Sequence, residues 1–190
     1  MIIITIGISG SGKNHLLNSL KEKESLWTDF DLKVVEPDDI RRKKLGDVNN
    51  QENGGMIFLI AKSMINRALK HNKDVFFNAT NLEWKRIIKF VLDLEKPDKI
   101  PVLFIFMTDS VDLNKCKWRV RKDIENGVDR SKVPEDVMDK QHERYMKCYR
   151  DSTYSEIGIN KCPENWKIYE YFNDLDKLIY FIEEMKNGNN

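Results

Sequence analysis

The stretch IGISGSGKNH, residues Ile6 to His15, has the residue types and the spacing of a phosphate-binding loop. A turn from a buried strand into the start of a helix exposes unpaired backbone N–H groups and the positive end of the helix dipole, which together bind phosphate. Glycines let the backbone approach closely, and Lys13 can place its charge at the β- and γ-phosphates of a nucleoside triphosphate. The residues expected to bind the nucleotide here are Gly7, Ser9, Gly10, Ser11, Gly12, Lys13 and Asn14.

Asn14 stands where the motif G-x-x-x-x-G-K-[ST] places a serine or threonine. The hydroxyl of that motif normally holds Mg²⁺, but a hard cation also accepts the carbonyl oxygen of a carboxamide. Asn14 is therefore expected to bind the metal directly or through a water. We expect phosphate binding to be intact and metal binding to be shifted.

The stretch EPDDIRR, residues 36–42, places two carboxylates where a strand is predicted to pass into a helix. Either Asp38 or Asp39 is expected to cap the helix. The other carboxylate can face the crevice and accept the proton of an acceptor hydroxyl while that oxygen attacks phosphorus. Arg41, three residues after Asp38, shares its helix face and can bind an acceptor phosphate bidentately.

Alternating strands and helices are predicted to position these residues. Apolar, β-branched runs typical of strands in a parallel sheet lie at 2–6, 32–39, 74–81, 100–108 and 166–172. Helical patterns lie at 13–23, 54–71, 82–96, 111–125, 134–149 and 174–186, whereas residues 150–163 show no period and are predicted as a surface excursion. The alternation indicates an α/β fold, in which Asn78, Thr80 and Asn81 reach the crevice beyond the strand ends.

The composition suits one domain without disulfides. The 190 residues carry 32 Lys+Arg against 31 Asp+Glu, and this net charge of +1 excludes a uniformly basic nucleic-acid binder, though not a local basic patch. Cys116, Cys148 and Cys162 share no metal-ligand spacing, which indicates free thiols in a reducing cytosol. No run approaches the ~20 apolar residues of a membrane span, and MIIITIG lacks the basic part of a signal peptide. We expect a cytoplasmic protein without a membrane partner. The cytoplasm of a phage-infected host is one setting that fits this expectation.

The chain resembles the kinase domain of phage polynucleotide 5′-hydroxyl kinase and related P-loop kinases. Four segments carry this resemblance: GISGSGK, PDDIRR, NATNL and a basic helix leading to VPEDV. The resemblance covers about residues 2–149. It implies a three-layer P-loop NTPase-type fold, a mostly parallel sheet flanked by helices, with a helical lid at about residues 112–133. The domain would span residues 1–190 and close with a helix at about 174–186.

The same resemblance implies roles for individual residues. ATP is the donor and Mg²⁺ its metal; Lys13 and the loop hold the triphosphate, and Asp38 is the base on the acceptor hydroxyl. Arg41 contacts the acceptor's phosphate, while Thr80 and Asn81 line the acceptor site. The family usually carries an aspartate in the segment matching 78–79, which this chain lacks, so Asp38 is also a candidate metal ligand beside Asn14.

The basic helix of the lid departs from the family at one position. Arg119 matches a family arginine, but the second arginine, expected four residues later, falls on Asp123. Arg121, Lys122 and Arg130 are candidates to replace it. Since cationic side chains over the γ-phosphate stabilise developing charge, Arg119 is assigned a catalytic and nucleotide-binding role and Arg130 a nucleotide-binding role.

The function predicted from the resemblance is transfer of the γ-phosphate of ATP to a hydroxyl of a nucleic acid, most simply a polynucleotide 5′-hydroxyl. The acceptor could instead be a hydroxymethylated pyrimidine in phage DNA, or a nucleoside or other small metabolite. A different class is a nucleotide-binding regulator without catalysis, which Asn14 and Asn78 would favour. Trp84, beside Lys85 and Arg86, either stacks a base or lies in the core of an amphipathic helix.

Overall fold

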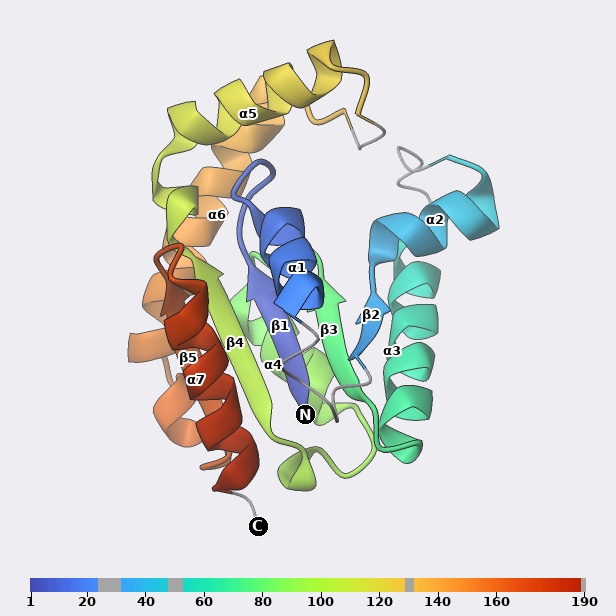
Figure 1. The fold of residues 1–190 in the computed structure, drawn as a ribbon, viewed down its shortest axis with the longest axis vertical. Helices are drawn as coiled ribbons and strands as arrows, with labels where there is room; N and C mark the ends of the chain where they lie inside the picture. Colours follow the sequence, from blue (N-terminus) through green and yellow to red (C-terminus); the bar gives the residue numbers. More distant parts are fainter. Residues whose placement is uncertain (24–31, 48–52, 129–131, 189–190) are drawn as a thin grey trace.

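A five-stranded sheet in the order β2-β3-β1-β4-β5 forms the centre of the protein, and every neighbouring pair of strands is parallel. The computed structural model describes residues 1–23, 32–47, 53–128 and 132–188. The strands are β1 (Ile2–Ile6), β2 (Leu32–Val35), β3 (Asp74–Asn78), β4 (Val102–Met107) and β5 (Trp166–Tyr171). Since all five run in one direction, their carboxyl ends meet at one edge of the sheet (Figure 1).

Helices connect the strands and cover both faces of the sheet (Figure 1). They are α1 (Lys13–Glu22), α2 (Pro37–Leu45), α3 (Gly54–Lys70), α4 (Trp84–Leu92), α5 (Leu113–Glu125), α6 (Glu135–Tyr154) and α7 (Leu175–Asn187), with short 3-10 turns η2 (Pro97–Lys99), η3 (Thr108–Val111) and η4 (Ile159–Lys161). Alternate residues of β1 face opposite sides. Ile3 packs with α1 and α7, whereas Ile2 and Ile4 pack with α3, α4 and α6. The three-layer α/β prediction is confirmed.

Four predicted boundaries were wrong by three residues or more, among them the strand predicted at 74–81, which ends at Asn78, and the helix predicted at 82–96, which ends at Leu92. The strand predicted at 32–39 ends at Val35, because Pro37 starts a helix whose first turn contains Asp38 and Asp39. The helix predicted to end at residue 149 continues to Tyr154, and Ser152 is buried with its hydroxyl donating to the carbonyl oxygen of Tyr149. Part of the predicted surface excursion is thus the last turn of α6.

Helix α5 forms the described core of the predicted lid. Asp112 caps it by accepting a hydrogen bond from the backbone N–H of Lys115. Glycine at position 127 follows the helix with a left-handed φ of 70°. Together with the start of α6, helix α5 stands above the carboxyl ends of β1 and β4, opposite α2 (Figure 1). Helix α5 therefore overhangs the edge where functional loops of a parallel sheet converge, as the predicted lid would.

Trp84, the three cysteines and the apolar helices were also the subject of predictions. Trp84 is 1% exposed and its indole N–H donates to the carbonyl oxygen of Ile157 over 2.7 Å, so the core interpretation is confirmed and the base-stacking one was wrong. Cys116, Cys148 and Cys162 are free thiols, as predicted. In the described parts of the chain, none of the helices combines the length and the apolar character that crossing a membrane requires.

Candidate active site

The glycine-rich loop joins β1 to α1 at the carboxyl edge of the sheet. Gly10 and Gly12 adopt left-handed φ angles of 82° and 94°, which residues with a Cβ rarely adopt. A Cβ on Gly10 would also lie 2.4 Å from the carbonyl oxygen of Cys116 in α5, so the loop packs closely under the lid helix. Gly12 occupies the N-cap of α1, so the backbone N–H groups of the first turn have no side-chain cap there. This is the geometry of a helix-terminal anion site.

Several polar groups of the loop have protein partners in this structure, whereas the Ser11 hydroxyl is buried without one among the described residues. The Lys13 ammonium donates to the carbonyl oxygens of Gly7 (2.8 Å) and Ile8 (2.7 Å). The backbone N–H of Ser9 donates to Oε1 of Gln141 in α6 over 2.9 Å. The loop is thus held between its own carbonyl groups and a side chain that is distant in the sequence.

A cavity of about 1030 Å³ opens at the carboxyl edge of the sheet. It is bounded by the loop, the start of α1, the end of β2, helix α2, the segment after β3 and the lid. Its lining includes Ser9, Gly10, Gly12, Lys13, Asn14, Glu36, Asp38, Asp39, Arg41, Phe58, Asn78, Thr80, Asp109, Arg119 and Asp123. The folded chain thus brings most of the sequence-predicted site residues around one cavity, which has room for a nucleotide and part of an acceptor.

A chain of hydrogen bonds joins Asn14 to a carboxylate that the sequence analysis missed. The side-chain nitrogen of Asn78 donates to Oδ1 of Asn14 over 2.8 Å and to Oε1 of Glu36 over 2.5 Å. The hydroxyl of Thr5 donates to Oδ1 of the same Asn78 over 3.3 Å. Asn78 itself is 7% exposed. The amides of Asn14 and Asn78 are therefore bonded to each other, and Glu36 is bonded to the second of them.

Asp38 and Arg41 form an ion pair on one face of α2, as their spacing predicts. Nη1 of Arg41 donates to Oδ1 of Asp38 over 2.5 Å. The Asp38 side chain is 56% exposed, whereas that of Arg41 is 10% exposed. Among the described residues, Nε of Arg41 is buried without a hydrogen-bond partner. The pair leaves carboxylate surface open to the cavity and one guanidinium donor unsatisfied.

Asp39 faces the basic side of α2. It accepts hydrogen bonds from Lys43 and Arg42, and the bond from Lys43 holds the pKa of Asp39 below its ordinary value. The expectation that Asp38 or Asp39 caps the helix was wrong: Glu36 occupies the N-cap, and it makes no side-chain capping bond. The reason is that Pro37 takes the first helical position, which moves the boundary upstream.

Arg119 of the lid helix lies over the loop. Its Nη1 donates to Oδ2 of Asp109 over 2.8 Å and to the carbonyl oxygen of Gly10 over 3.3 Å. Lys115 donates to the other oxygen of Asp109 over 2.8 Å. Burial alone would raise the pKa of Asp109, but the bonds from Lys115 and Arg119 outweigh it and hold the pKa below its ordinary value. Asp109 thus holds Arg119 beside the phosphate loop.

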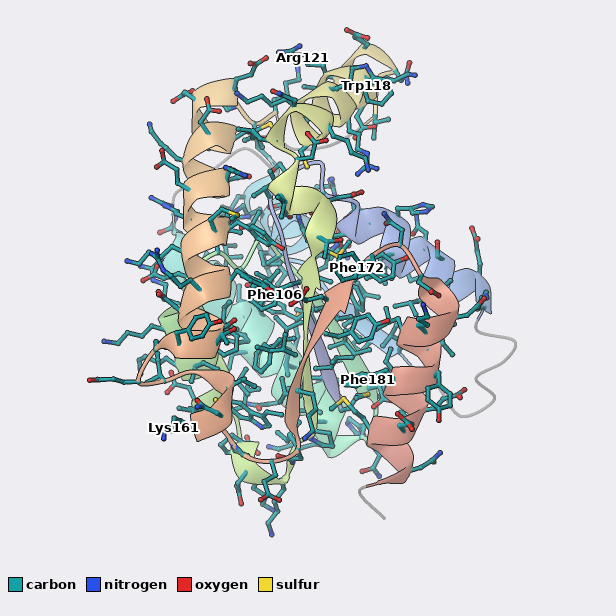
Figure 2. All side chains as sticks on the ribbon, turned by 90° about the vertical axis from the view of Figure 1, so that its left-hand side faces the viewer. Phe106, Trp118, Arg121, Lys161, Phe172 and Phe181 are labelled. Atoms are coloured by element: carbon teal, nitrogen blue, oxygen red, sulfur yellow. The ribbon has the colours of Figure 1, made fainter. Side chains whose placement is uncertain are left out.

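The other predicted lid cations are directed elsewhere or lie outside the described residues. Arg121 pairs with Glu135, and the Lys122 ammonium lies 4.6 Å from the ring centre of Trp118. Figure 2 shows Arg121 and Trp118 on α5 at the top of the molecule, remote from Phe106 in the core. Neither Arg121 nor Lys122 lines the cavity, whereas Asp123 does. Arg130 falls in 129–131, outside the described residues.

In the segment after β3, Thr80 lines the cavity, whereas Asn81 bonds the backbone of β1. Thr80 lines the cavity, and its carbonyl oxygen accepts the backbone N–H of Gly7 over 3.0 Å. Asn81 is not among the lining residues; its amide donates to the carbonyl oxygen of Thr5 over 2.9 Å. Phe58 also lines the cavity, although the sequence did not predict it there, and its ring packs edge-on against Phe77 with centroids 6.3 Å apart. The sequence feature that could have indicated Phe58 is an aromatic residue on the outward side of an apolar helix.

Comparison with known proteins agrees with this fold. The family model described as an AAA domain (AAA_33) matches residues 2–148, so the chain belongs to this family, and its domain is P-loop kinase-like. A chain from the "Pnkp1/Rnl/Hen1 RNA repair complex" superimposes with a TM-score of 0.65 at 18% identity over 79% of this chain. This chain covers 45% of the length of that one.

A second solved structure matches the whole chain. A Chloroflexus aurantiacus protein, provisionally described as a kinase, superimposes with a TM-score of 0.66 at 13% identity and covers 100% of this chain and 97% of its own. At such identities these likenesses establish the fold alone. No curated protein matches the sequence.

Proposed function

We propose that this P-loop kinase-like domain, taken as one unit over residues 1–190, transfers the γ-phosphate of ATP to a hydroxyl of a nucleic acid, most simply a polynucleotide 5′-hydroxyl. The observation that carries the proposal is the Asp38–Arg41 pair, which lines the same cavity as the phosphate loop. A carboxylate and a guanidinium side by side suit an acceptor with a hydroxyl and a nearby phosphate. A 5′-terminal nucleotide has both.

The donor side of the cavity supplies positive charge and backbone donors. The triphosphate would lie along the loop at the start of α1, where the N–H groups and helix dipole attract its oxygens. Lys13 would exchange its bonds to the Gly7 and Ile8 carbonyls for bonds to phosphate oxygens. Arg119, held beside the loop by Asp109, would stabilise the charge that develops on the transferring group.

The acceptor side provides a base and an anchor. Asp38 would accept the proton of the attacking hydroxyl as the new P–O bond forms and the bond to the ADP leaving group breaks. Arg41, which lines the cavity beside Asp38, would bind an acceptor phosphate through its guanidinium group. Thr80, on the segment after β3, would line the acceptor's path.

The residues present fit the Mg²⁺ that accompanies ATP in P-loop kinases. Asn14 presents a carbonyl oxygen at the cavity, and Asn78 fixes the orientation of that amide. Within the described ranges no group of three or more His, Cys, Asp or Glu residues could hold a metal ion, so phosphate oxygens and waters would complete the coordination shell. The metal, when bound, offsets negative charge on the phosphates. Asp38 is the other candidate ligand.

The test is transfer of label from [γ-³²P]ATP to a panel of acceptors. The panel contains 5′-hydroxyl DNA and RNA oligonucleotides, DNA with hydroxymethylated pyrimidines but phosphorylated ends, a nucleoside, and the matching nucleoside 3′-monophosphate. We expect label at 5′-hydroxyl ends, and the 3′-monophosphate should be a better acceptor than the nucleoside by about 10-fold or more, since only it offers Arg41 a phosphate.

Other results would assign the site differently. Label only on the hydroxymethyl group, or equal label on nucleoside and nucleoside 3′-monophosphate, would refute the proposed acceptor and favour the alternative kinases. Tight ATP binding with no transfer to any acceptor would favour a regulator without catalysis. The variant Arg41→Ala serves as a matched control, because it should abolish the difference between nucleoside and nucleoside 3′-monophosphate.

A further inference from the structure

The hydrogen bonds of Asn78 bring two side-chain oxygens, one from Asn14 and one from Glu36, close together at the cavity. Asn78 lies at the end of β3 and is buried, while Asn14 comes from the start of α1 and Glu36 from the end of β2. Both Oδ1 of Asn14 (2.8 Å) and Oε1 of Glu36 (2.5 Å) accept from its single side-chain nitrogen. The carbonyl oxygen and the carboxylate are therefore neighbours, although they are 22 positions apart in the sequence.

The direction of each amide follows from the carboxylate. An ionised carboxylate only accepts hydrogen bonds, so Glu36 must face the nitrogen of Asn78 and not its oxygen. That choice is consistent with Thr5, whose hydroxyl donates to the Asn78 oxygen. The same nitrogen then requires that Asn14 turn its oxygen, and not its own nitrogen, toward it. Glu36 thereby fixes Asn14 in the orientation in which its oxygen faces the cluster.

Both oxygens retain capacity for a cation. A carboxylate has about four lone-pair positions and an amide oxygen has two, and Asn78 occupies one of each. Asn14 is exposed, Glu36 is half-buried, and both line the cavity beside Lys13. Mg²⁺ at phosphate-transfer sites is held by one or two carboxylates together with phosphate oxygens and waters. One carboxylate and one amide oxygen beside the phosphate loop match that pattern.

Asp38 is less suited to the metal than Glu36. Its carboxylate is engaged by the guanidinium of Arg41 over 2.5 Å, and a cation placed there would compete with that charge. Glu36, in contrast, accepts from a neutral amide. Of the two acids at the start of α2, Glu36 is therefore suited to the metal and Asp38 to the acceptor.

We propose that Glu36 is the carboxylate ligand, direct or through one water, of the divalent cation that binds with the donor triphosphate, and that Asn78 is the positioning residue that holds Glu36 and the Asn14 oxygen for it. The inference rests on the proposed function only in requiring that the loop bind a nucleoside triphosphate. It gives a physical reason for the asparagine at position 14: its carbonyl oxygen, held by Asn78 beside Glu36, would take the place of the hydroxyl that the phosphate-loop motif has there.

The test measures metal binding directly, without turnover. Mn²⁺ serves as the probe by electron paramagnetic resonance, with the full chain and a non-hydrolysable imido analogue of ATP. Glu36→Gln should weaken Mn²⁺ binding in the ternary complex by about 10–100-fold. The glutamine keeps an oxygen that can accept from Asn78, and Glu36 makes no capping bond, so the variant should fold normally. Glu36→Asp, which keeps the charge, should lose less affinity than Glu36→Gln.

Binding of the analogue in EDTA separates this inference from the proposed function. Without metal, Glu36→Gln should bind the analogue as tightly as the wild type or more tightly, because a negative charge beside the phosphates is gone. Asp39→Asn removes the same charge from a residue paired with Lys43 and should keep the wild-type Mn²⁺ affinity. If the wild type binds no analogue in any condition, the proposed function fails.

Two results would overturn the inference while leaving nucleotide binding in place. One is an unchanged Mn²⁺ affinity in Glu36→Gln. The other is a loss of Mn²⁺ affinity in Asp38→Asn with none in Glu36→Gln, which would place the metal on Asp38. Asn78→Ala adds a check on positioning: it should weaken Mn²⁺ binding while leaving the metal-free analogue affinity unchanged.

Discussion

Asp38→Asn is the substitution that tests the chemistry of the site most directly. The amide keeps the size of the side chain and one oxygen that Arg41 can still bond, but it cannot take up the proton of the acceptor. A general base contributes ~10²–10⁴-fold, which corresponds to about 2.7–5.5 kcal/mol of activation free energy. The affinity for ATP should be nearly unchanged, because the loop and not α2 binds the donor.

The stability cost of the same change is smaller and can be separated. Asp38 bonds a guanidinium that is 10% exposed, but the Asp38 side chain itself is 56% exposed, so solvent screens the pair. We expect a loss of about 1 kcal/mol, or roughly 2–4 °C in Tm for a chain of this size. Since domains are stable by about 5–15 kcal/mol, the variant remains folded at 25 °C and its slow transfer cannot be attributed to unfolding.

The assay is single-turnover transfer of the γ-phosphate with saturating acceptor, beside ATP binding by calorimetry. Asp39→Asn is the control: Asp39 pairs with Lys43 and Arg42 on the exposed side of α2, so transfer should continue at the wild-type rate. A wild-type rate in Asp38→Asn, with a slow Asp39→Asn, would move the base by one residue. Loss of ATP binding in Asp38→Asn would refute the reasoning more deeply, because it would place this carboxylate on the donor side.

The remaining predictions address the loop, the metal, the lid and the core. Lys13→Ala should abolish transfer and weaken binding of ATP in calorimetry, since no other side chain of the loop is cationic; unchanged turnover would remove the phosphate-loop argument. Asn14→Ser should keep or improve activity and lower the Mg²⁺ concentration needed for half-maximal transfer, whereas Asn14→Leu should raise that concentration steeply. Identical Mg²⁺ titrations for all variants would show that Asn14 does not bind the metal. Because the pKa of Asp109 is lowered in the folded state, its contribution to stability is present above its unfolded pKa of about 3.9 and is lost as pH falls through the folded value. Asp109→Asn should therefore flatten the acid limb of the stability curve below about pH 4, measured by urea denaturation, and an unaltered limb would contradict the shift. Trp84→Ala should cost about 3–5 kcal/mol in the same measurement, since the ring is buried and its N–H bonds Ile157; a loss below about 1 kcal/mol would show that the core collapses around the site.

The fold was readable from the sequence because its strands are unambiguous. The uncharged run that contains Val102–Met107 and the β-branched run Ile2–Ile6 are buried along their whole length, as central parallel strands require. The boundary after Val35 was misplaced because the acids that follow were taken as the end of the strand, whereas Pro37 begins a helix. The local sequence pattern located the helices and strands but misplaced the ends of several of them.

The site was readable where its geometry is local. The three-residue spacing of Asp38 and Arg41 predicted their shared face, and the loop motif predicted the position of Lys13. Glu36 and Gln141 were missed because their contacts are set by the tertiary structure and not by spacing: Glu36 meets Asn78 across 42 positions, and Gln141 meets Ser9 across 132. The first contact depends on β2 being next to β3 and the second on where α6 packs, and a single sequence states neither.

The bonds that the loop makes within the protein bear on which ligands it can select. Lys13 is bonded to two carbonyl oxygens, the Ser9 N–H to Gln141, and Arg119 to Asp109. A phosphate group that takes over one of these partners must break the existing bond first, so that contact yields only the difference between two hydrogen bonds. A single phosphate or sulfate replaces few of them and gains little. A chain of phosphates would replace more of them together, so we expect the loop to favour linked phosphate groups over a single phosphate of similar charge.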